Sequence, residues 1–428
     1  MTIAKIVWAI FWCIYLWQVT YCNEQVRWQV LIYMEVGDNL SDVALKSLHD
    51  LTLENTSQKV SVCVQVHTHG QQAWRYRITH NALLREDSIS LATDMADTIT
   101  QAAQWAFSQD AEHHMLIFYG HAYGILNPTW DKITQNWCFE EDNAYKSSYW
   151  SYDSQVNSID QEWNTYYHMH HRALLSTKDP RTYVTNTQLL KALNTISTSI
   201  INKKIAIVGI DACMMAMVEV AYELSPFVNY LVASQECELK DGWDYKALIG
   251  SLSNKEYTPE QISKEIVLAY DRYYSQRISY YASYTQSALK LSNMRYIKEH
   301  IVKLVTHIHT YSSAHKKLLK SVLYKARIIS PRFCFIAMYT DMYTFYQYIM
   351  HYLGHLEGDH PLKQLIPIYN EGIALLNTII IAKCSGSLHT QVKGLSIYCP
   401  YAHIDSSYSN TFETESCWKE FIRFLTEQ

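Results

Sequence analysis

The chain has 428 residues, of which 48% are hydrophobic and 18% are charged. This balance is typical of a folded globular protein and excludes a chain dominated by disorder. The formal net charge of −5 is spread along the sequence without a basic stripe, which argues against a nucleic-acid-binding protein. The length is sufficient for one large hydrophobic core, or for one core with an appended subdomain.

The N-terminus differs from the rest of the chain. An uncharged apolar run from Ile6 to Trp17 follows Lys5, and it is too short to span a bilayer but suits the core of a signal peptide. We therefore expect residues 1–22 to direct export, to a secreted, periplasmic or cell-surface location. A buried strand or helix is the alternative. Cys22 faintly resembles a lipoprotein cleavage site, but Tyr21 stands where a small residue is expected, so lipid anchoring at Cys22 is a minority interpretation.

Short apolar runs alternate with amphipathic stretches over the first 260 residues or so. The runs predict strands at 28–34, 60–66, 115–119, 205–210 and 230–234, with a shorter, edge-type strand at 74–78. The intervening stretches predict helices at 95–108 and 187–196, and one through Leu45 and Leu48 with Asp38 or Ser41 as N-cap. This alternation predicts an α/β fold with a mostly parallel sheet that helices cover on both faces.

Two regions interrupt this pattern. Residues 127–181 are polar and aromatic without a clear period, which is typical of a functional insertion or a flexible segment. Residues 258–381 show helical periodicity, and a strand from Val392 to Tyr398 follows, closed by Pro400. We therefore expect an α/β domain at 23–257 with this insertion. A helical C-terminal region at 258–428 follows, which returns a late strand, near 392–399, to the sheet.

A histidine and a cysteine follow two of the predicted strands. His121 comes after 115–119 and Gly120, and Cys213 comes two residues after Asp211. In doubly wound sheets, reacting groups gather just past the carboxyl ends of the strands. A thiolate is a strong nucleophile, and a nearby imidazole can lower the pKa of the thiol or protonate a leaving amine. A helix beginning near Met214 would add amides that favour the thiolate. Spacing alone leaves open that both residues are structural.

Four sequence blocks resemble those of the clostripain-like cysteine peptidases, in the same order. They are Trp28–Leu40, Asp211–Leu224 around the cysteine, Tyr230–Tyr245 with its Ser-Gln-Glu and Gly-Trp-Asp-Tyr motifs, and Gly394–Pro400. The resemblance runs from about residue 28 to the C-terminus and is weakest across 127–181 and the helical region. It implies a caspase-like α/β fold, shared with gingipains, legumains and caspases, in which the histidine and the cysteine follow neighbouring strands.

The resemblance also implies roles for individual residues. Cys213 would be the nucleophile, His121 the acid–base partner, and the backbone amides of Ala122 and Cys213 the oxyanion site. The family has glycine after the histidine, so Ala122 would cost on the order of 1 kcal/mol if that position needs a positive φ. Asp211 matches the acid that recognises Arg or Lys, with a helix N-cap as its alternative role. Asp241 is a weaker second candidate for substrate binding, or an ordinary turn residue.

Further expectations concern maturation and ions. Family members are often matured by self-cleavage between the histidine and the cysteine, where the basic residues are Lys132, Lys146, Arg172, Lys178 and Arg181. No cofactor is required, although some members depend on calcium; a solvated loop accounts better for the acidic cluster at residues 140–142. His168, His170 and His171 lack a matched carboxylate or cysteine partner, so we expect no metal site there.

The sequence thus predicts an exported cysteine endopeptidase that cleaves proteins or peptides after Arg or Lys through an acyl-enzyme. Because Ala122 departs from the family pattern, the alternative is a degenerate member that binds basic peptides without cleaving them. An unrelated α/β hydrolase is a more distant alternative, and the sequence contains no Gly-x-Ser-x-Gly elbow to support it.

Overall fold

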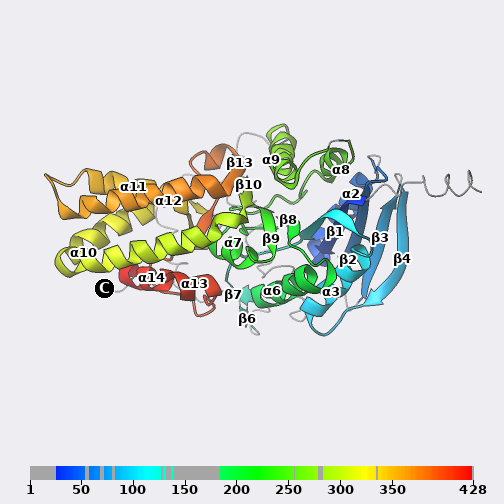
Figure 1. Ribbon diagram of the computed structural model, residues 1–428, viewed down its shortest axis with the longest axis horizontal. Coiled ribbons are helices and arrows are strands. Elements are labelled where there is room, and N and C mark those ends of the chain that lie inside the picture. The colour runs from blue at the N-terminus through cyan, green and yellow to red at the C-terminus, as the bar shows by residue number, and fades with distance from the viewer. Residues whose placement is uncertain are drawn as a thin grey trace, which may run out of the picture.

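The computed structural model describes residues 26–53, 57–67, 72–79, 82–126, 129–131, 136–138, 184–254, 256–277, 283–333 and 336–426. Within these residues the main sheet has nine strands in the order β13-β10-β9-β8-β5-β1-β2-β3-β4 (Figure 1). Their bounds are β1 Val26–Glu35, β2 Val60–His67, β3 Gln72–Thr79, β4 Ala82–Ser90, β5 Ala111–Tyr119, β8 Ile205–Asp211, β9 Val228–Ala233, β10 Thr285–Lys290 and β13 Ile380–Ser385.

The centre of the sheet is parallel and its two edges are antiparallel. Strand β1 runs parallel to β2 and β5, β5 to β8, and β8 to β9, whereas β3, β4, β10 and β13 join in antiparallel pairs. The predicted mostly parallel α/β sheet is therefore confirmed. The prediction of an edge strand at 74–78 is wrong, because β3 lies between β2 and β4. Its polar side chains are bonded across the sheet, Arg75 to Gln65 and Arg77 to Glu86.

Helices cover both faces of the sheet. Successive side chains along a strand point to opposite faces, and in the central strands both sets are apolar and need covering. Along β1, Leu31 and Tyr33 belong to the hydrophobic core on one face, whereas Val30, Ile32 and Met34 belong to the core on the other. The first face is covered by α3 Met95–Ala106, α6 Asn186–Thr195 and α7 Val218–Leu224. The second is covered by α2 Gly37–Asp50, α8 Tyr245–Asn254 and α9 Pro259–Ser275.

Helix α2 begins earlier than its expected caps. The N-cap is Val36, with no side-chain capping bond, rather than Asp38 or Ser41. The chain turns directly from β1 into the helix, because the Val36 N–H donates to the His67 carbonyl and its own carbonyl accepts from Leu40. The end of the strand therefore determines where this helix starts.

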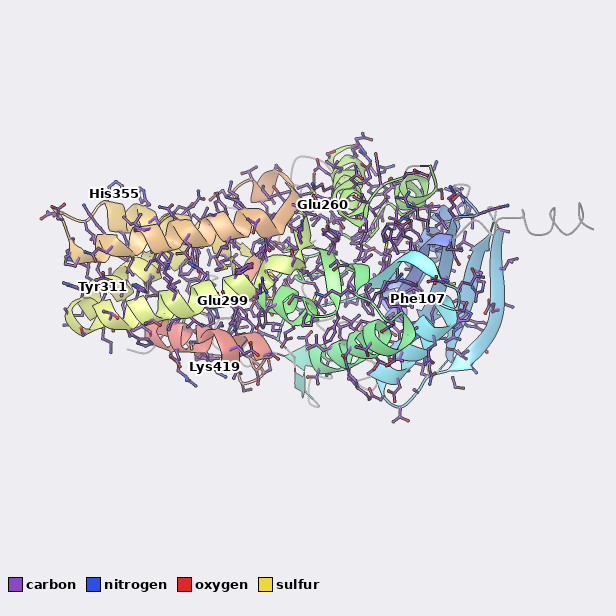
Figure 2. The ribbon with its side chains drawn as sticks, viewed as in Figure 1. Phe107, Glu260, Glu299, Tyr311, His355 and Lys419 are labelled. Carbon is purple, nitrogen blue, oxygen red and sulfur yellow. The ribbon has the colours of Figure 1, made fainter. Side chains whose placement is uncertain are left out.

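The C-terminal region forms a helical arm that projects from the sheet (Figure 1). The arm consists of α10 Met294–Ile329, α11 Met342–Gly354, α12 Ile366–Ile379 and α14 Trp418–Thr426. Helix α10 has a kink at His315, whose backbone is not helical. Side chains fill the space between these helices, and Tyr311 and His355 lie toward the end of the arm that is remote from the sheet (Figure 2).

The C-terminal region returns strands to the main sheet, but not the strand that we expected. Strand β14, Ser396–Tyr398, pairs with β12 in a separate small sheet, and the strands that join the main sheet are β10 and β13. Strand β10 lies within the region predicted to be helical, because the apolar alternation is weak where Thr285, Gln286 and Ser287 are buried polar residues. The small sheet consists of β11 Arg332–Phe333, β12 Ile336–Asp341 and β14.

Short elements complete the described chain. They are β6 Thr129–Asp131, β7 Asn136–Cys138, η1 Ile196–Ile200, η2 Leu291–Asn293, η3 Pro361–Leu365, η4 Ser387–His389 and α13 Thr411–Ser416. The expected signal segment at 1–22 and nearly all of the insertion at 127–181 lie outside the described residues. In the part of the chain that is described, no helix has the length and apolar character needed to span a bilayer.

Candidate active site

The register of two central strands brings the predicted catalytic residues together. Strands β5 and β8 are parallel neighbours, with Tyr119 paired to Asp211, and the Gly120 N–H donates to the Asp211 carbonyl at 3.3 Å. His121 and Cys213 each follow this pair by two residues, at the carboxyl edge of the sheet. Because neighbouring strands lie about 4.8 Å apart, the two residues leave the sheet side by side.

The thiol of Cys213 is held against a loop that follows β9. Its Sγ accepts a hydrogen bond from the backbone N–H of Glu238 at 3.3 Å. Burial and the neighbouring carboxyls of Glu238, Glu236 and Asp211 together raise the pKa of this thiol to about 12, against the opposing effect of the Glu238 N–H. This environment favours the protonated form of Cys213.

The segment after the cysteine is not helical, contrary to the expectation of a helix near Met214. Helix α7 begins only at Val218, and Met214 itself has a left-handed φ of 58°. The Met214 N–H donates to the Glu236 carbonyl, and the Ala216 N–H donates to the Ser234 carbonyl. Because the amides of this buried segment are bonded to Glu236 and Ser234 and its backbone makes a turn at Cys213 and Met214, no helix starts there, and helix amides do not stabilise the thiolate of Cys213.

Ala122 is buried next to His121, and its backbone is unstrained. Among the described non-glycine residues, a positive φ occurs at Asn202, Met214 and Cys417, and Ala122 is not one of them. The cost considered for an alanine in place of the family glycine therefore does not arise at this position. The positive φ values of the turn from β5 instead fall on its glycines, 157° at Gly120 and 68° at Gly124.

Asp211 ends β8 with its side chain directed into the protein, where it is 2% exposed. Its Oδ2 accepts hydrogen bonds from the Trp243 N–H at 3.0 Å and from the Tyr245 hydroxyl at 2.9 Å. Burial raises the pKa of this carboxyl to about 7, although both donors oppose the shift. The alternative role as a helix N-cap is excluded, because α7 is capped at Met217 without a side-chain bond.

Asp241 lies at the surface, in the loop between β9 and α8. Its carboxylate accepts from the Tyr273 hydroxyl at 2.8 Å and lies 3.4 Å from the Lys46 ammonium, and its side chain is 47% exposed. The tyrosine bond and the Lys46 charge lower the pKa of this carboxyl, although partial burial acts in the opposite direction. The structure thus holds Asp211 inside the protein and Asp241 at its surface.

Sequence reasoning missed one acid beside the nucleophile. The Glu238 carboxyl accepts from the Gln286 amide at 2.8 Å and from the Trp243 indole N–H at 3.5 Å. Burial raises the pKa of this carboxyl well above its usual range, and the charge of Asp211 adds to the shift. No periodicity or strand end marks Glu238, because it lies in an irregular loop whose path depends on the fold.

The residue before Glu238 in this loop is covalently restrained, because Cys237 is disulfide-bonded. Among the described cysteines the free thiols are Cys63, Cys213, Cys384, Cys399 and Cys417. The candidate processing sites (Lys132, Lys146, Arg172, Lys178 and Arg181), the acidic cluster at 140–142 and the histidines at 168, 170 and 171 lie outside the described residues.

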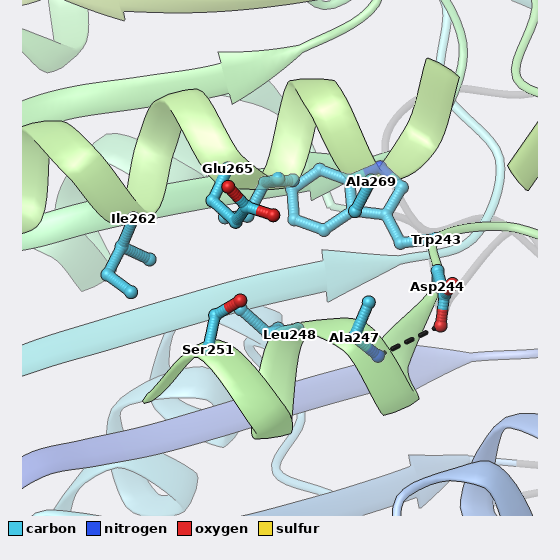
Figure 3. Close-up of a pocket in the computed structure, with 9 residues that line it drawn as sticks. Trp243, Asp244, Ala247, Leu248, Ser251, Ile262, Glu265 and Ala269 are labelled. Atoms are coloured by element: carbon cyan, nitrogen blue, oxygen red, sulfur yellow. Dashed lines mark hydrogen bonds between the residues drawn. The ribbon is translucent and has the colours of Figure 1, made fainter. Parts of the chain in front are cut away.

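A small pocket of ≈ 280 Å³ lies between α8 and α9 (Figure 3). It shares Trp243 with the Asp211 site and is otherwise lined by Asp244, Ala247, Leu248, Ser251, Ile262, Glu265, Ile266 and Ala269. Asp244 caps α8 by accepting from the Ala247 N–H at 2.9 Å, and Glu265 forms an ion pair with Arg272. Its polar groups are thus engaged, and neither His121 nor Cys213 lines this pocket.

Comparison with known proteins agrees with this architecture. The sequence model of the Clostripain family, peptidase C11, matches residues 163–423. A secreted C11 cysteine protease from Bacteroides thetaiotaomicron, solved with an irreversible peptide inhibitor, superimposes with a TM-score of 0.60 at 15% identity, covering 92% of this chain and 99% of that one. An inactive zymogen C11 protease from Parabacteroides distasonis gives 0.56 at 14% identity, covering 94% and 97%. No curated protein sequence matches.

Proposed function

Because this chain belongs to the clostripain family of cysteine peptidases, we propose that it is an endopeptidase that cleaves after Arg or Lys, with Cys213 as nucleophile and His121 as acid–base partner. The observation that carries the proposal is the pairing of Tyr119 with Asp211, from which both residues follow at equal spacing on adjacent strands. This arrangement supports attack and proton transfer at one substrate carbonyl.

The proposed reaction has two proton transfers through the histidine. Cys213 gives its proton to His121, and the thiolate attacks the carbonyl carbon of the scissile bond. The backbone amides of Ala122 and Cys213 stabilise the oxyanion, and His121 then protonates the leaving amine as the C–N bond breaks. In the second half, His121 removes a proton from water as the water oxygen attacks the thioester, and it returns this proton to the sulfur as the C–S bond breaks, which releases the carboxylic acid and the free thiol.

Asp211 supports the preference for basic residues. Its carboxyl lies at the edge of the sheet two residues before the nucleophile, and its Oδ1 is buried without a hydrogen-bond partner among the described residues. A guanidinium or ammonium group would complete the bonding of this oxygen and stabilise its ionised form. Asp241, which bonds to Lys46 and Tyr273, is the second candidate for the same role.

Export and self-processing belong to the same proposal. The apolar run at 6–17 supports a cleaved signal peptide, and the disulfide at Cys237 supports an oxidising location outside the cytosol. The raised pKa of the Cys213 thiol supports the view that the uncleaved chain is a precursor. We propose that cleavage after a basic residue in the 127–181 insertion converts this precursor to the active enzyme.

Intact mass before and after incubation tests the catalytic proposal, with Cys213→Ala as the control. We expect the wild-type chain to be cut after one of the basic residues in the insertion and the variant to stay whole. The processed enzyme should hydrolyse an Arg-amide fluorogenic peptide, and a basic chloromethyl ketone should label Cys213. A folded wild-type protein that binds such peptides without turnover would instead support the degenerate binding module.

The specificity proposal has its own variants. Asp211→Asn keeps the shape of the side chain but removes its charge, so kcat/KM for an Arg substrate should fall by about 10- to 100-fold, with less effect on a Gln substrate. Asp241→Asn is measured in parallel on the same two substrates. If Asp241→Asn alone abolished the Arg preference, recognition would belong to Asp241 and the assignment of Asp211 would be wrong.

A further inference from the structure

Two buried carboxyls lie beside the nucleophile and share one tryptophan. The Trp243 N–H donates to Asp211 Oδ2, and its indole N–H donates to Glu238 Oε1. Glu238 also touches the nucleophile directly, because its backbone N–H donates to Cys213 Sγ. The loop from Glu238 to Trp243 therefore ties both acids and the thiol into one structural unit.

No positive charge balances this pair within the described residues. The ion pairs formed by the described Lys, Arg and His side chains do not include Asp211 or Glu238. Two buried carboxylates without a cation are costly, and removing the charge by protonation is the usual response. The site is thus built to gain from a cation that enters it from outside.

We propose that Glu238 acts with Asp211 as a second specificity-determining acid, so that the basic side chain of the substrate is bound by both carboxyls. This inference deepens the proposed preference for Arg or Lys and rests on it. A guanidinium has five N–H donors and suits two carboxyls, of which one accepts through the free Oδ1 of Asp211 and the other through Glu238. An ammonium offers three donors and makes fewer of these bonds.

We expect binding of the basic side chain to release a proton from the carboxyl pair. Burial raises the pKa of both carboxyls, and the charge of Asp211 adds to the shift of Glu238, so we expect the empty pair to share one proton near neutral pH. Entry of a cation favours the doubly ionised pair, and the proton leaves to solvent as the ion pairs form. The titratable groups that face the pair are Cys213, Tyr119, Tyr245, Tyr270, Tyr274 and Cys384.

The kinetic test compares Glu238→Gln with Glu260→Gln in the processed enzyme. Glu260 lies on α9 in ion pairs with Lys264 and Lys290 and serves as the matched control. We expect Glu238→Gln to lower kcat/KM by about 10- to 100-fold for an Arg-amide peptide, mostly through KM, and by less for the Gln-amide analogue. Unchanged alkylation of Cys213 by iodoacetamide would show that the loop is intact.

Equal loss on the Arg and Gln substrates, or no loss on either, would overturn the role of Glu238. The experiment distinguishes failure of the Glu238 role from failure of the proposed function. A wild-type enzyme that does not prefer Arg over Gln would refute the basic specificity itself, whatever Glu238→Gln does. A wild-type preference that Asp211→Asn removes and Glu238→Gln leaves intact would refute only the second acid.

Proton release is measured with benzamidine as the cationic probe and the processed enzyme with its thiol blocked by methyl methanethiosulfonate. Calorimetric titration at pH 7 in two buffers of different ionisation enthalpy counts the protons released on binding. We expect up to one proton per site in the wild type and at least a twofold smaller release in Glu238→Gln, because one partner of the shared proton is missing. Equal proton release in both proteins would contradict the shared proton.

Discussion

Cys213, the proposed nucleophile, is not activated by its own backbone. The segment after Cys213 is non-helical up to Val218, so no helix amides favour a thiolate there, and three neighbouring carboxyls act in the opposite direction. Any lowering of the thiol pKa must therefore come from His121 or from rearrangement on processing.

The reactivity of Cys213 in the unprocessed chain should consequently depend steeply on pH. Because its pKa is raised to about 12, the thiolate fraction should rise roughly tenfold for each pH unit between 7 and 10. A chain in which all the candidate basic residues of the insertion are replaced by Gln stays whole, and iodoacetamide labelling mapped by mass spectrometry gives the rate. The fully buried Cys63 and Cys399 serve as internal controls and should label far more slowly.

A plateau in the labelling rate below pH 8 would contradict this prediction. It would mean that His121 already holds Cys213 as a thiolate before processing. The same measurement on the processed enzyme then shows by how much cleavage lowers the pKa.

At the scale of elements, the turn after β5 is fixed by packing against the nucleophile segment. Gly124 has a φ of 68°, and a Cβ there would lie 2.5 Å from Met217 Sδ and 2.9 Å from the Met214 carbonyl oxygen. The Leu126 N–H donates to the Tyr339 hydroxyl of β12, which anchors the end of the turn. The turn that carries His121 thus depends on the segment that carries Cys213.

Gly124→Ala should therefore impair both stability and activity. The left-handed backbone costs an alanine about 1–2 kcal/mol, and overpacking adds about 1–3 kcal/mol. We expect a lower free energy of unfolding in urea and a lower kcat/KM, because His121 shifts relative to Cys213. Gly354→Ala is the control, since Gly354 ends α11 and nothing lies within 4 Å of its added Cβ. If the two variants were equally stable, the proposed packing constraint would be wrong.

The same elements show what the sequence could and could not predict. Continuous apolar runs identified β5 and β8, and parallel pairing then required His121 and Cys213 to leave the sheet together. The helix expected at Met214 failed because tertiary bonds from Glu236 and Ser234 override the local pattern. Glu238 was missed for a related reason, since its burial arises from Gln286 on β10, a strand whose polar residues concealed it.

On the scale of the whole molecule, the C-terminal region supports the active site rather than standing apart from it. The Ser396 N–H of β14 donates to the Ala216 carbonyl, three residues after the nucleophile. Glu219 on α7 accepts from the Tyr398 N–H at 2.9 Å and from the Tyr408 hydroxyl at 3.2 Å. These contacts attach the small sheet and the following loop to the helix behind Cys213.

Glu219 makes this attachment dependent on pH. Burial raises the pKa of its carboxyl to about 7, from 4.5 for an exposed glutamate. Because the folded-state pKa is the higher one, the protonated carboxyl favours folding fully below pH 4.5. That contribution is lost as the pH rises through about 7, where the folded chain must hold a buried charge.

Glu219→Gln should remove this dependence while keeping the oxygen that accepts both hydrogen bonds. The free energy of unfolding of the variant, relative to wild type, should increase by roughly 2.5 kcal/mol between pH 5 and pH 8, since each pKa unit corresponds to about 1.4 kcal/mol. Urea denaturation of both proteins at the two pH values measures this difference. Glu223→Gln, a change one turn further along α7, serves as a comparison for a less buried acid. A difference between wild type and Glu219→Gln that stayed constant from pH 5 to pH 8 would show that Glu219 is not the group that titrates.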